Sequence, residues 1–511
     1  MSRVTVADVV VDGLQRAGTP RIFGVPGGGS SLDLLEAARR AGMPFVLTHG
    51  ETAAAIMAAV TGELLDVPGA ALVALGPGAA RAVDGVAHAR LDRAPMVLLT
   101  DRHPAAALAF TTHQVIDHRA LLAPVTKASV VLEAASAAHW VAHAAQLAMK
   151  APRGPVHLDL AADVAGAAAV PVATSCRPAP LPYPDARALD EAARRLGAAS
   201  RPVLVVGLDA CSDDAAKWVR AVAEALPAPV LVTYKAKGVL PDPHPLALGL
   251  ITGGVIEERV LGQADLVVAV GFDPVELVPR PWSVAAPVLH LSRAPHESAA
   301  YRPAAGVVGD VGAILEELAP RLRDRQRSDW DVAALDRLKR ELGGRLAIPV
   351  AGLAPHRVVQ IARDATPPGT IATCDAGAHM VPVTAFWHAV APREFLVSNG
   401  LATMGFALPA AIAAALAAPD RRVLAFTGDG GLLIAAAEME TAARLGLPIV
   451  VIVFDAASLH AGPDWPALAR SFGWTAFAAG SEVELSQALE TAFTSRGPAL
   501  IAARIITPWP S

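Results

Sequence analysis

Short runs of apolar residues alternate along the chain with stretches in which apolar residues recur every three or four positions. Residues 422–426 and 449–454 are almost entirely apolar, which is typical of strands buried on both faces of a parallel sheet. Between them, residues 432–445 carry charged side chains on one side and apolar ones on the other, and Gly446 and Pro448 follow. This pattern predicts a helix that ends at the glycine. Strand, glycine turn, helix and strand together form a βαβ unit.

The first 165 residues repeat this alternation and predict one parallel-sheet domain. Thr5 and Asp8 have the spacing of a capping box, which predicts a helix running to about Ala17. Glycine turns separate the apolar runs that follow. We expect strands at residues 21–23, 45–48, 71–75, 95–100 and 154–159, and helices at residues 31–40 and 52–64.

Two further α/β domains are predicted beyond this one. Residues 171–184 are rich in proline, which favours an extended linker. A charged helical connector is expected at residues 318–347. The fold class is therefore α/β, with three doubly wound parallel-sheet domains at residues 1–165, 185–320 and 350–511. The strands expected in the second domain are residues 203–206, 230–233, 266–270 and 288–291.

One internal similarity suggests that the first and third domains are related. Residues 35–44 resemble residues 439–448, and in both places a glycine loop precedes the helix and a strand follows the proline. Alanine-rich helices also look alike by accident, so duplication and coincidence both remain open at this point.

Composition excludes some classes of function. The chain has 511 residues and a formal charge of −5. The absence of any basic run argues against nucleic-acid binding. The three cysteines, Cys176, Cys211 and Cys374, are far apart and have neither disulfide-framework nor metal-site spacing, which favours buried thiols in a reducing cytoplasm.

The sequence also gives no reason to expect a membrane protein. The N-terminus lacks a signal-peptide pattern. Residues 401–419 form an uncharged run that approaches membrane-span length, but Gly405, Pro409 and many alanines favour a helix buried within the protein. We therefore expect a cytoplasmic protein with no membrane partner.

Two places carry candidate chemistry. The turn from Gly428 to Gly431 leaves bare backbone N–H groups at the start of a predicted helix, which suits a diphosphate, and Asp429 within it can hold a divalent cation. Glycines at such turns also serve tight turning alone. Glu51 follows a predicted strand and stands next to His49. It is either a helix N-terminal acid or a buried carboxylate with a specific partner.

Taken together, the glycine-rich and acidic motifs resemble those of thiamine-diphosphate-dependent decarboxylases and carboligases. The resemblance covers essentially the whole chain and is closest to the flavin-independent acetolactate synthases, so FAD is not expected. It implies pyrimidine-binding, central and diphosphate-binding domains, in that order. The motifs of the wider family are Gly24-Val-Pro-Gly27, His49-Gly-Glu51, Gly76-Pro-Gly78, residues 399–405 and Gly428-Asp-Gly-Gly431, and those of the nearer branch are Thr112-His-Gln114, Pro124-Val-Thr-Lys127, residues 271–276 and residues 375–379.

The resemblance implies roles for the cofactor residues. Glu51 would bond to the aminopyrimidine and promote the imino form that takes the C2 proton, leaving a nucleophilic ylid. Met404 would support the bent cofactor, and the backbone of Ala402 would accept a bond from its amino group. His379 would contact the diphosphate. Gly76, Gly430 and Gly431 complete the expected cofactor contacts. Without the resemblance, Met404 would be interpreted as core filler and His379 as a surface residue.

It implies substrate and metal residues as well. His113 and Gln114 would face the substrate carboxylate, since a histidine can donate a hydrogen bond to a 2-oxo acid and shuttle a proton. On its own His113 would be an ordinary loop residue. Asp429 would bind Mg²⁺ together with the backbone carbonyl of Ser458. Family members form the site between two chains, Glu51 coming from one and Asp429 from the other, so a homodimer or homotetramer is expected.

Three departures from the family pattern limit what the resemblance implies. The family's second metal ligand would stand at Ala456, and Asp455 is one residue early. Because side chains alternate along a strand, Asp455 would need a bulge to turn inward, and a water molecule is the favoured replacement. The segment from Ala456 to Phe472, part of the lid, is shorter than in relatives. Gly28 stands where that branch has a lysine.

The predicted function is therefore a thiamine-diphosphate- and magnesium-dependent enzyme acting on a 2-oxo acid. Within that class, carboligation of two pyruvates to acetolactate competes with simple decarboxylation to an aldehyde. A non-catalytic relative that retains the fold is the alternative from another class, and retention of Glu51, His113, Gln114 and Met404 favours the enzyme.

Overall fold

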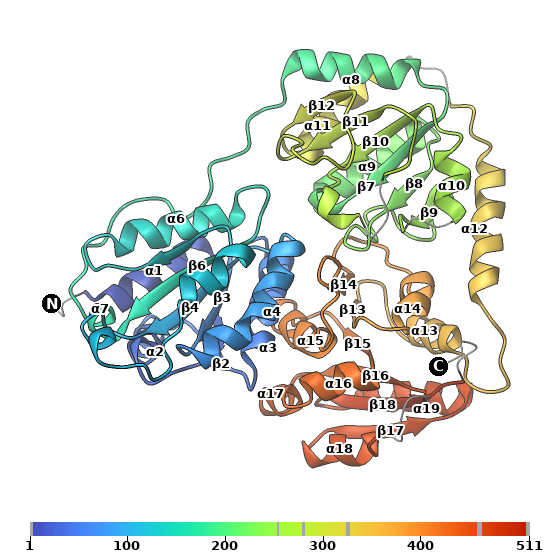
Figure 1. Cartoon of the computed structure of the whole chain (residues 1–511). Helices are drawn as coiled ribbons and strands as arrows, with labels where there is room; N and C mark the ends of the chain where they lie inside the picture. Colours follow the sequence, from blue (N-terminus) through green and yellow to red (C-terminus); the bar gives the residue numbers. More distant parts are fainter. Residues whose placement is uncertain (1–3, 253–254, 278–281, 323–327, 457–461, 507–511) are drawn as a thin grey trace.

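The structure is a computed structural model that describes residues 4–252, 255–277, 282–322, 328–456 and 462–506. In this part of the chain, three six-stranded sheets contain only parallel strand pairs and have helices on their faces (Figure 1). The predicted fold class is confirmed. Residues 171–184 lie outside helices and strands, as their prolines predict.

The first sheet has the strand order β2-β1-β3-β4-β6-β5. The capping box is confirmed, because Asp8 N–H donates to Thr5 Oγ1 and Thr5 N–H donates to Asp8 Oδ2. The strands are β1 (Ile22–Val25), β2 (Phe45–Leu47), β3 (Gly69–Val73), β4 (Met96–Arg102), β5 (Ser129–Val131) and β6 (Pro155–Ala161), and the helices are α1 (Val6–Ala17), α2 (Ser30–Arg40), α3 (Glu51–Leu65), α4 (Pro77–Leu91), α5 (His118–Leu122), α6 (Ala137–Met149) and α7 (Ala162–Ala165).

The second sheet has a different order, β12-β11-β10-β7-β8-β9, in which the direction of winding reverses between β7 and β10. Its strands are β7 (Pro202–Val206), β8 (Val230–Val232), β9 (Ala247–Leu250), β10 (Leu266–Val270), β11 (Val288–Ser292) and β12 (Ala305–Val308), and its helices are α8 (Ala186–Ala198), α9 (Asp213–Ala225), α10 (Val255–Leu261) and α11 (Val311–Leu318). Helix α12 (Val332–Leu346) forms the second half of the predicted connector to the third domain.

The third sheet has the order β14-β13-β15-β16-β18-β17. Its strands are β13 (Ile371–Cys374), β14 (Phe395–Val397), β15 (Val423–Gly428), β16 (Ile449–Asp455), β17 (Thr475–Ala479) and β18 (Ala499–Arg504), and its helices are α13 (Pro355–Asp364), α14 (Met380–Phe386), α15 (Ala407–Ala417), α16 (Asp429–Ala435), α17 (Glu438–Arg444), α18 (Trp465–Ser471) and α19 (Glu482–Thr494).

The single helix predicted over residues 432–445 is wrong in two respects. The helical segment begins earlier, at Asp429, and it is divided into α16 and α17 by a turn at residues 436–437. After this turn, the buried carboxylate of Glu438 accepts hydrogen bonds from the backbone of the first domain. Helix periodicity cannot reveal such a long-range contact, and the contact prevails over local preference.

The internal similarity does not identify equivalent elements. The first and third sheets do have the same strand order when their strands are numbered along the chain. However, β2 occupies an edge of the first sheet, whereas β16 lies inside the third. Residues 35–44 and 439–448 therefore occupy different positions, and their likeness reflects alanine-rich helix composition rather than a shared place in the fold.

Helices α3 and α15 join the first and third domains in one hydrophobic core. Nearly every residue of both helices is buried, and the core cluster they belong to includes Ile56 and Met57 of α3 and Phe406 and Ile412 of α15. The helices lie side by side in Figure 1. Small alanine side chains allow close approach of the two helix backbones. The prediction that the apolar run at residues 401–419 is an internal helix is confirmed.

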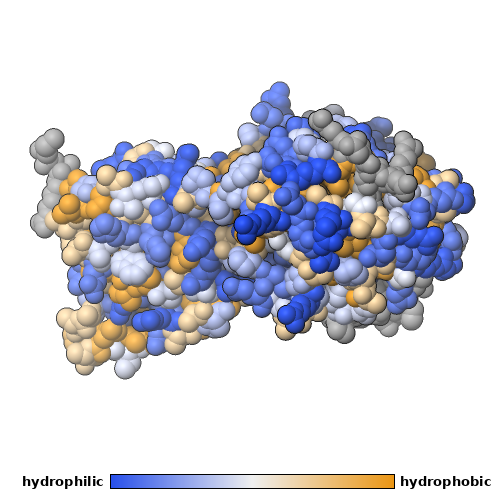
Figure 2. Space-filling model, turned by 90° about the horizontal axis from the view of Figure 1, so that it is seen from above, coloured by the Kyte–Doolittle hydropathy of each residue, from blue (hydrophilic) through white to orange (hydrophobic). Residues whose placement is uncertain are grey.

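The surface gives no contrary indication. Among the described residues, no helix combines the length and apolar character needed to cross a membrane. On the face shown in Figure 2, hydrophobic and hydrophilic residues are interspersed.

A buried carboxylate braces the central domain. Glu276 is fully enclosed, and it accepts hydrogen bonds from the Thr233 hydroxyl and from Leu208 N–H, at the ends of β8 and β7. Burial raises the pKa of Glu276 to about 8, although these hydrogen bonds act in the opposite direction.

We expect Glu276 to make stability fall with rising pH. The unfolded chain releases this proton near pH 4.5, whereas the folded protein keeps it until about pH 8, so its stabilisation is complete below the lower value and lost as pH rises through the upper one. The loss is on the order of a few kcal/mol. Urea unfolding of wild type and Glu276→Gln at about pH 5.5 and pH 8 measures it. Equal pH dependence in both proteins would contradict this assignment.

Candidate active site

Glu51 is the first residue of α3, separated by three residues from the end of β2 at Leu47, and its side chain is buried. Both properties considered from the sequence are therefore present, the helix N-terminal position and burial. Among the described residues, its ion pair is to Arg81 of the same domain, with 3.9 Å between Oε2 and Nη1. The N–H groups of His49 and Gly50 donate to Oε1 of Glu438 at 3.0 and 2.8 Å. The third domain thus holds the backbone that presents Glu51.

Gly76 begins the turn into α4 and packs directly against Gln114. Its φ is +61°, and a Cβ placed on it would lie 2.6 Å from the Gln114 carbonyl oxygen. Gln114 itself has a φ of +57°, which is uncommon for a residue with a side chain and marks a constrained position. The glycine is therefore required both for the turn and for the close approach of the second segment.

His118 and Asp159, which the sequence did not single out, hold this turn in place through hydrogen bonds. Gly76 N–H donates to Nε2 of His118 at 3.0 Å. Since an amide can only donate, Nε2 accepts, and Nδ1 carries the proton toward Asp159 Oδ1, 3.1 Å away. Both side chains are buried. The position of Asp159 at the end of a predicted strand was the signal that could have identified it.

The two expected substrate residues lie in an exposed segment over the edge of the first sheet. The His113 carbonyl accepts a hydrogen bond from His103 at 2.8 Å, and its imidazole is exposed. Gln114 lines a cavity of about 390 Å³ together with His103, His118 and Asp159. The structure therefore brings Gln114, rather than both residues, to this cavity.

Asp375 joins the two segments of the third domain that carry candidate cofactor residues. It accepts hydrogen bonds from Phe406 N–H at 2.8 Å and from the Thr427 hydroxyl at 2.7 Å. A Cβ on Gly431 would lie 2.2 Å from its Oδ2. Burial raises the pKa of Asp375 to about 6, against the effect of these hydrogen bonds. The sequence motif included Asp375 but gave no indication of this bracing role.

His379 lies beside the glycine turn that precedes α16. Its ring stacks on Phe454 with 5.5 Å between centroids, and a Cβ on Gly428 would be 3.2 Å from its Nδ1. Burial lowers the pKa of His379 to about 4, so the imidazole is neutral near pH 7. Its Nε2 is buried and has no hydrogen-bond partner in the described structure. An anionic oxygen at the turn would supply the missing partner. The alternative of a surface histidine is wrong.

Met404 lies close to the same turn, two residues after Ala402. Ala402 has a φ of +54°, in the left-handed region. Met404 is 47% exposed, so the alternative that it fills the core is wrong. A Cβ on Gly430 would lie 3.2 Å from Met404 Cε. The methionine is thus adjacent to the turn formed by Asp429, Gly430 and Gly431, where Gly430 N–H donates to the Asp429 carboxylate at 2.7 Å.

Comparison with known proteins agrees with this arrangement. Residues 4–121, 189–318 and 375–461 match the N-terminal, central and C-terminal domain families of thiamine pyrophosphate enzymes, thiamine pyrophosphate being thiamine diphosphate. The catabolic acetolactate synthase of Raoultella terrigena is 30% identical, with 97% of this chain and 94% of that protein covered. The chain belongs to the thiamine-diphosphate-dependent enzymes.

Other relatives of this thiamine-diphosphate-dependent enzyme have similar names. An acetolactate synthase of Bacillus subtilis is 29% identical, with 97% of this chain and 92% of that protein covered. The large subunit of acetolactate synthase isozyme 1 from Escherichia coli is also 29% identical, with 98% and 94% covered. Similarity over nearly full length means that all three domains take part in the resemblance.

The metal site expected in the third domain of this thiamine-diphosphate-dependent enzyme has few acidic side chains among the described residues. Strand β16 pairs with β18 in unbroken register through Asp455, which is opposite Arg504. This register has no bulge up to Asp455, the last residue of the strand, and strand alternation continued by one residue would point position 456 to the opposite side. No group of three or more His, Cys, Asp or Glu side chains suited to a metal ion occurs among the described residues. Ser458, the expected carbonyl ligand, lies outside them.

In this thiamine-diphosphate-dependent enzyme, the loop between β1 and α2 is held in place where it enters α2. Asp101 accepts hydrogen bonds from Ser31 N–H and from the Ser31 hydroxyl at 2.6 and 2.8 Å. A Cβ on Gly28 would meet nothing within 4 Å. Packing at the Cβ therefore does not require a glycine at position 28, where the resemblance implied a lysine.

The contact between Gly76 and Gln114 gives a test with a matched control. Gly76→Ala and Gly42→Ala both place a side chain at positive φ, each at a cost of roughly 1–2 kcal/mol, but a Cβ on Gly42 meets nothing within 4 Å. We expect both variants to lose stability, Gly76→Ala by more, because its Cβ also meets the Gln114 carbonyl oxygen. Only Gly76→Ala should also lower the rate of substrate turnover, by about 100-fold, because it displaces Gln114.

Thermal unfolding and steady-state kinetics measure these two effects. Equal turnover in the two glycine variants would show that the position of Gln114 has no influence on the reaction.

Proposed function

We propose that this protein decarboxylates pyruvate and joins the remaining two-carbon unit to a second pyruvate, giving acetolactate and carbon dioxide. The observation that carries the proposal is the similarity to acetolactate synthases along nearly the whole length of the chain. The cofactor is thiamine diphosphate, without flavin. When bound, it supplies a nucleophilic carbon, C2, and an electron sink for decarboxylation.

The chain's own residues fit this cofactor. The unpartnered Nε2 of buried His379 and the N–H group of Gly431 would bond to the diphosphate, and Gly430 N–H would do so once it leaves the Asp429 carboxylate. Ala402, held in the left-handed region, would offer its carbonyl to the aminopyrimidine, and half-exposed Met404 would support the ring system. Glu51 would form a hydrogen bond to the aminopyrimidine and exchange a proton with it.

Residues of the first domain would orient the substrate and transfer protons to or from it. A hydrogen bond from Gln114 or His113 would orient the 2-oxo acid carboxylate, and the imidazole of His113 would move a proton to or from the substrate oxygen. The bond from His118 to the Gly76 turn supports this arrangement, since Gly76 contacts Gln114 directly.

We infer that Mg²⁺ neutralises part of the diphosphate charge, with Asp429 as a ligand. The unbroken register of β16 argues against a contribution from Asp455. A water molecule in place of the missing side chain costs at most about 2 kcal/mol of immobilisation.

The active enzyme is proposed to be a homo-oligomer, either a dimer or a tetramer, with sites between chains. Large apolar side chains next to the candidate cofactor residues are about half exposed or more in the single chain, which supports coverage by a second copy. These side chains are Val381 (49% exposed), Met404 (47%), Leu433 (46%) and Ile434 (64%).

Release of an aldehyde after decarboxylation is the second candidate. The observation in its favour is the short connection from Ala456 to α18, which leaves less chain to cover the site. Greater access of water would favour protonation over attack on a second 2-oxo acid. Incubation with pyruvate, thiamine diphosphate and Mg²⁺ tests both candidates. Acetolactate as the main product supports the proposal, acetaldehyde supports the second candidate, and failure to release carbon dioxide contradicts both.

The role of Glu51 has its own test. Glu51→Gln keeps the size and burial of the side chain and removes its capacity to exchange a proton. We expect proton–deuterium exchange at C2 of the bound cofactor to slow by about 100-fold or more, with cofactor affinity largely retained. Nuclear magnetic resonance after acid quench measures the exchange. Exchange as fast as in wild type would exclude Glu51 as the activating acid.

The proposed metal ligands predict different effects of substitutions at two neighbouring positions. Ala456→Asn should tighten magnesium-dependent binding of thiamine diphosphate severalfold, because it restores an oxygen ligand on the correct side of the strand. Asp455→Ala should change it little. Calorimetric titration with and without Mg²⁺ measures both. Loss of binding in Asp455→Ala, with no change in Ala456→Asn, would identify Asp455 as the ligand instead.

A further inference from the structure

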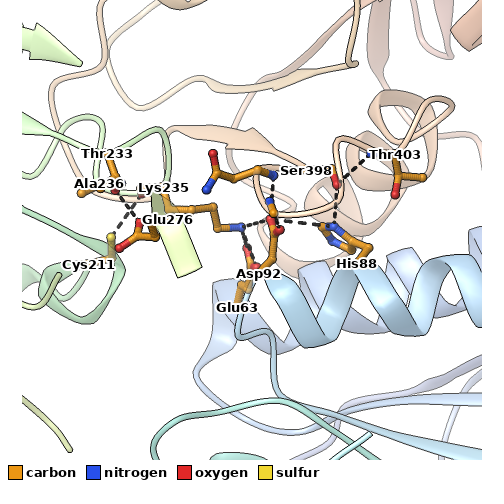
Figure 3. Close-up of polar contacts among 12 residues, drawn as sticks. Glu63, His88, Asp92, Cys211, Thr233, Lys235, Ala236, Glu276, Ser398 and Thr403 are labelled. Carbon is orange, nitrogen blue, oxygen red and sulfur yellow. Dashed lines mark hydrogen bonds and ion pairs between the residues drawn. The ribbon is translucent and has the colours of Figure 1, made fainter. Parts of the chain in front are cut away.

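Helix α4 carries a polar stripe that faces the third domain. Asp84 and His88 lie four residues apart, as do His88 and Asp92, which caps the helix, so all three project from one side. The stripe contacts the segment between β14 and α15 that contains Ala402 and Met404. Thr403 donates to Asp84 at 3.3 Å, and Nδ1 of His88 is 2.9 Å from the Ser398 hydroxyl. Figure 3 shows the contact from His88 through Ser398 to Thr403.

Asp92 makes the closest connection to this segment. Its Oδ1 accepts the N–H of Gly400 at 2.8 Å, and its Oδ2 accepts the N–H of Asn399 at 3.1 Å. The Asp92 side chain is completely buried. Two backbone donors directed at one carboxyl group need both of its oxygens as acceptors, and only the ionised form provides both fully.

Lys235 of the central domain provides the charge that keeps this carboxylate ionised. Its Nζ lies 3.2 Å from Asp92 Oδ2 and 2.6 Å from Oε1 of Glu63. Burial alone would raise the pKa of Asp92, but Lys235 and the hydrogen bonds from residues 399 and 400 hold it below the ordinary value. In Figure 3 the lysine extends from the green ribbon of the central domain between the two acids on the blue ribbon.

The network therefore connects all three domains at one point. Lys235 follows β8, Glu63 lies in α3, and Asp92 caps α4. The segment whose N–H groups donate to Asp92 leads from β14 to the candidate cofactor residues. A buried ion pair of this kind is not itself evidence of net stabilisation. Its geometry is better explained by the position that it imposes on the segment.

We propose that Lys235 is a positioning residue for the cofactor, which acts through Asp92 to fix the segment from Asn399 to Met404 in the conformation that binds the aminopyrimidine. This inference rests on the proposed function. The side chain of Lys235 does not itself contact any of the candidate cofactor residues in the described structure, so its effect must be transmitted through Asp92.

The same loop offers a matched control. Lys237, two residues further on, is also buried, and it pairs with Asp242 at 2.7 Å. Asp242 accepts the N–H of Ala389, so this pair also joins the central and third domains, but without reaching residues 399–404. Loss of Lys237 should therefore disturb the domain contact to a similar extent without releasing the cofactor segment.

The experiment compares Lys235→Met with Lys237→Met by titrating thiamine diphosphate into each protein with Mg²⁺ present. Lys235→Met should raise the dissociation constant by about 10- to 100-fold. Without the lysine, Asp92 loses the charge that strengthens its hydrogen bonds to the segment. Lys237→Met should leave it near the wild-type value. Thermal unfolding of both variants reports any general loss of stability. Equal weakening of cofactor binding in the two variants would overturn the proposal.

Two further variants test transmission through Asp92. Lys235→Arg retains a charge for Glu63 and Asp92, and it should recover most of the affinity. Asp92→Asn should weaken binding by itself, and adding Lys235→Met to it should cause little further loss, since the route is already broken. Additive effects in the double variant would contradict the proposed route. Asp92→Asn and Lys235→Arg still decide the question if Lys235→Met does not fold.

The outcomes also separate this inference from the function on which it rests. If wild type does not bind thiamine diphosphate, the proposed function is wrong. If wild type binds it and Lys235→Met binds it equally well, the proposed function stands and the role of Lys235 is wrong.

Discussion

The packing of α3 against α15 is the constraint on which the rest of the structure depends. Both helices bury most of their residues, so each must be covered by its own sheet and by the other helix. This shared core brings the start of α3, with Glu51, beside Glu438 of the third domain. It also places the adjacent helix α4 against the segment that leads to Met404. This contact therefore fixes where the candidate cofactor residues of the first and third domains lie within one chain.

Buried carboxylates then fix the glycine-rich turns that surround the site. Asp375 holds the turn after β15, Asp92 holds Gly400, and Asp159 acts on Gly76 through His118. In each case the acid accepts hydrogen bonds from groups that would otherwise lose water without compensation. Such turns expose backbone N–H groups to a ligand, while the buried carboxylate holds the rest of the turn in place. The arrangement explains how loops with few side chains of their own can present a defined surface to a cofactor.

Local patterns along the chain were enough to predict parallel sheets and some of their strands, and the resemblance was enough to predict the family. Apolar runs marked strands such as β7, β15 and β16, and the capping box at Thr5 was confirmed. The strands that were not expected are β5, β9, β12, β13, β14, β17 and β18. What could not be predicted depends on residues far apart in the sequence, such as Asp92 and Gly400, which no local pattern relates. The turn at residues 436–437 was missed for the same reason, since Glu438 bonds to the first domain. Alanine-rich composition produced a misleading internal alignment, because alanine specifies helix but no position in the fold.

In the proposed function, the turn at Gly428–Gly431 and the unpartnered nitrogen of His379 bind the diphosphate. This is tested most directly by comparing thiamine diphosphate with thiamine, which lacks the phosphates, in calorimetric titrations of the purified protein with Mg²⁺ present. We expect saturable binding of the diphosphate and affinity for thiamine weaker by orders of magnitude. Equal affinity for the two compounds, or no binding of either, would contradict it.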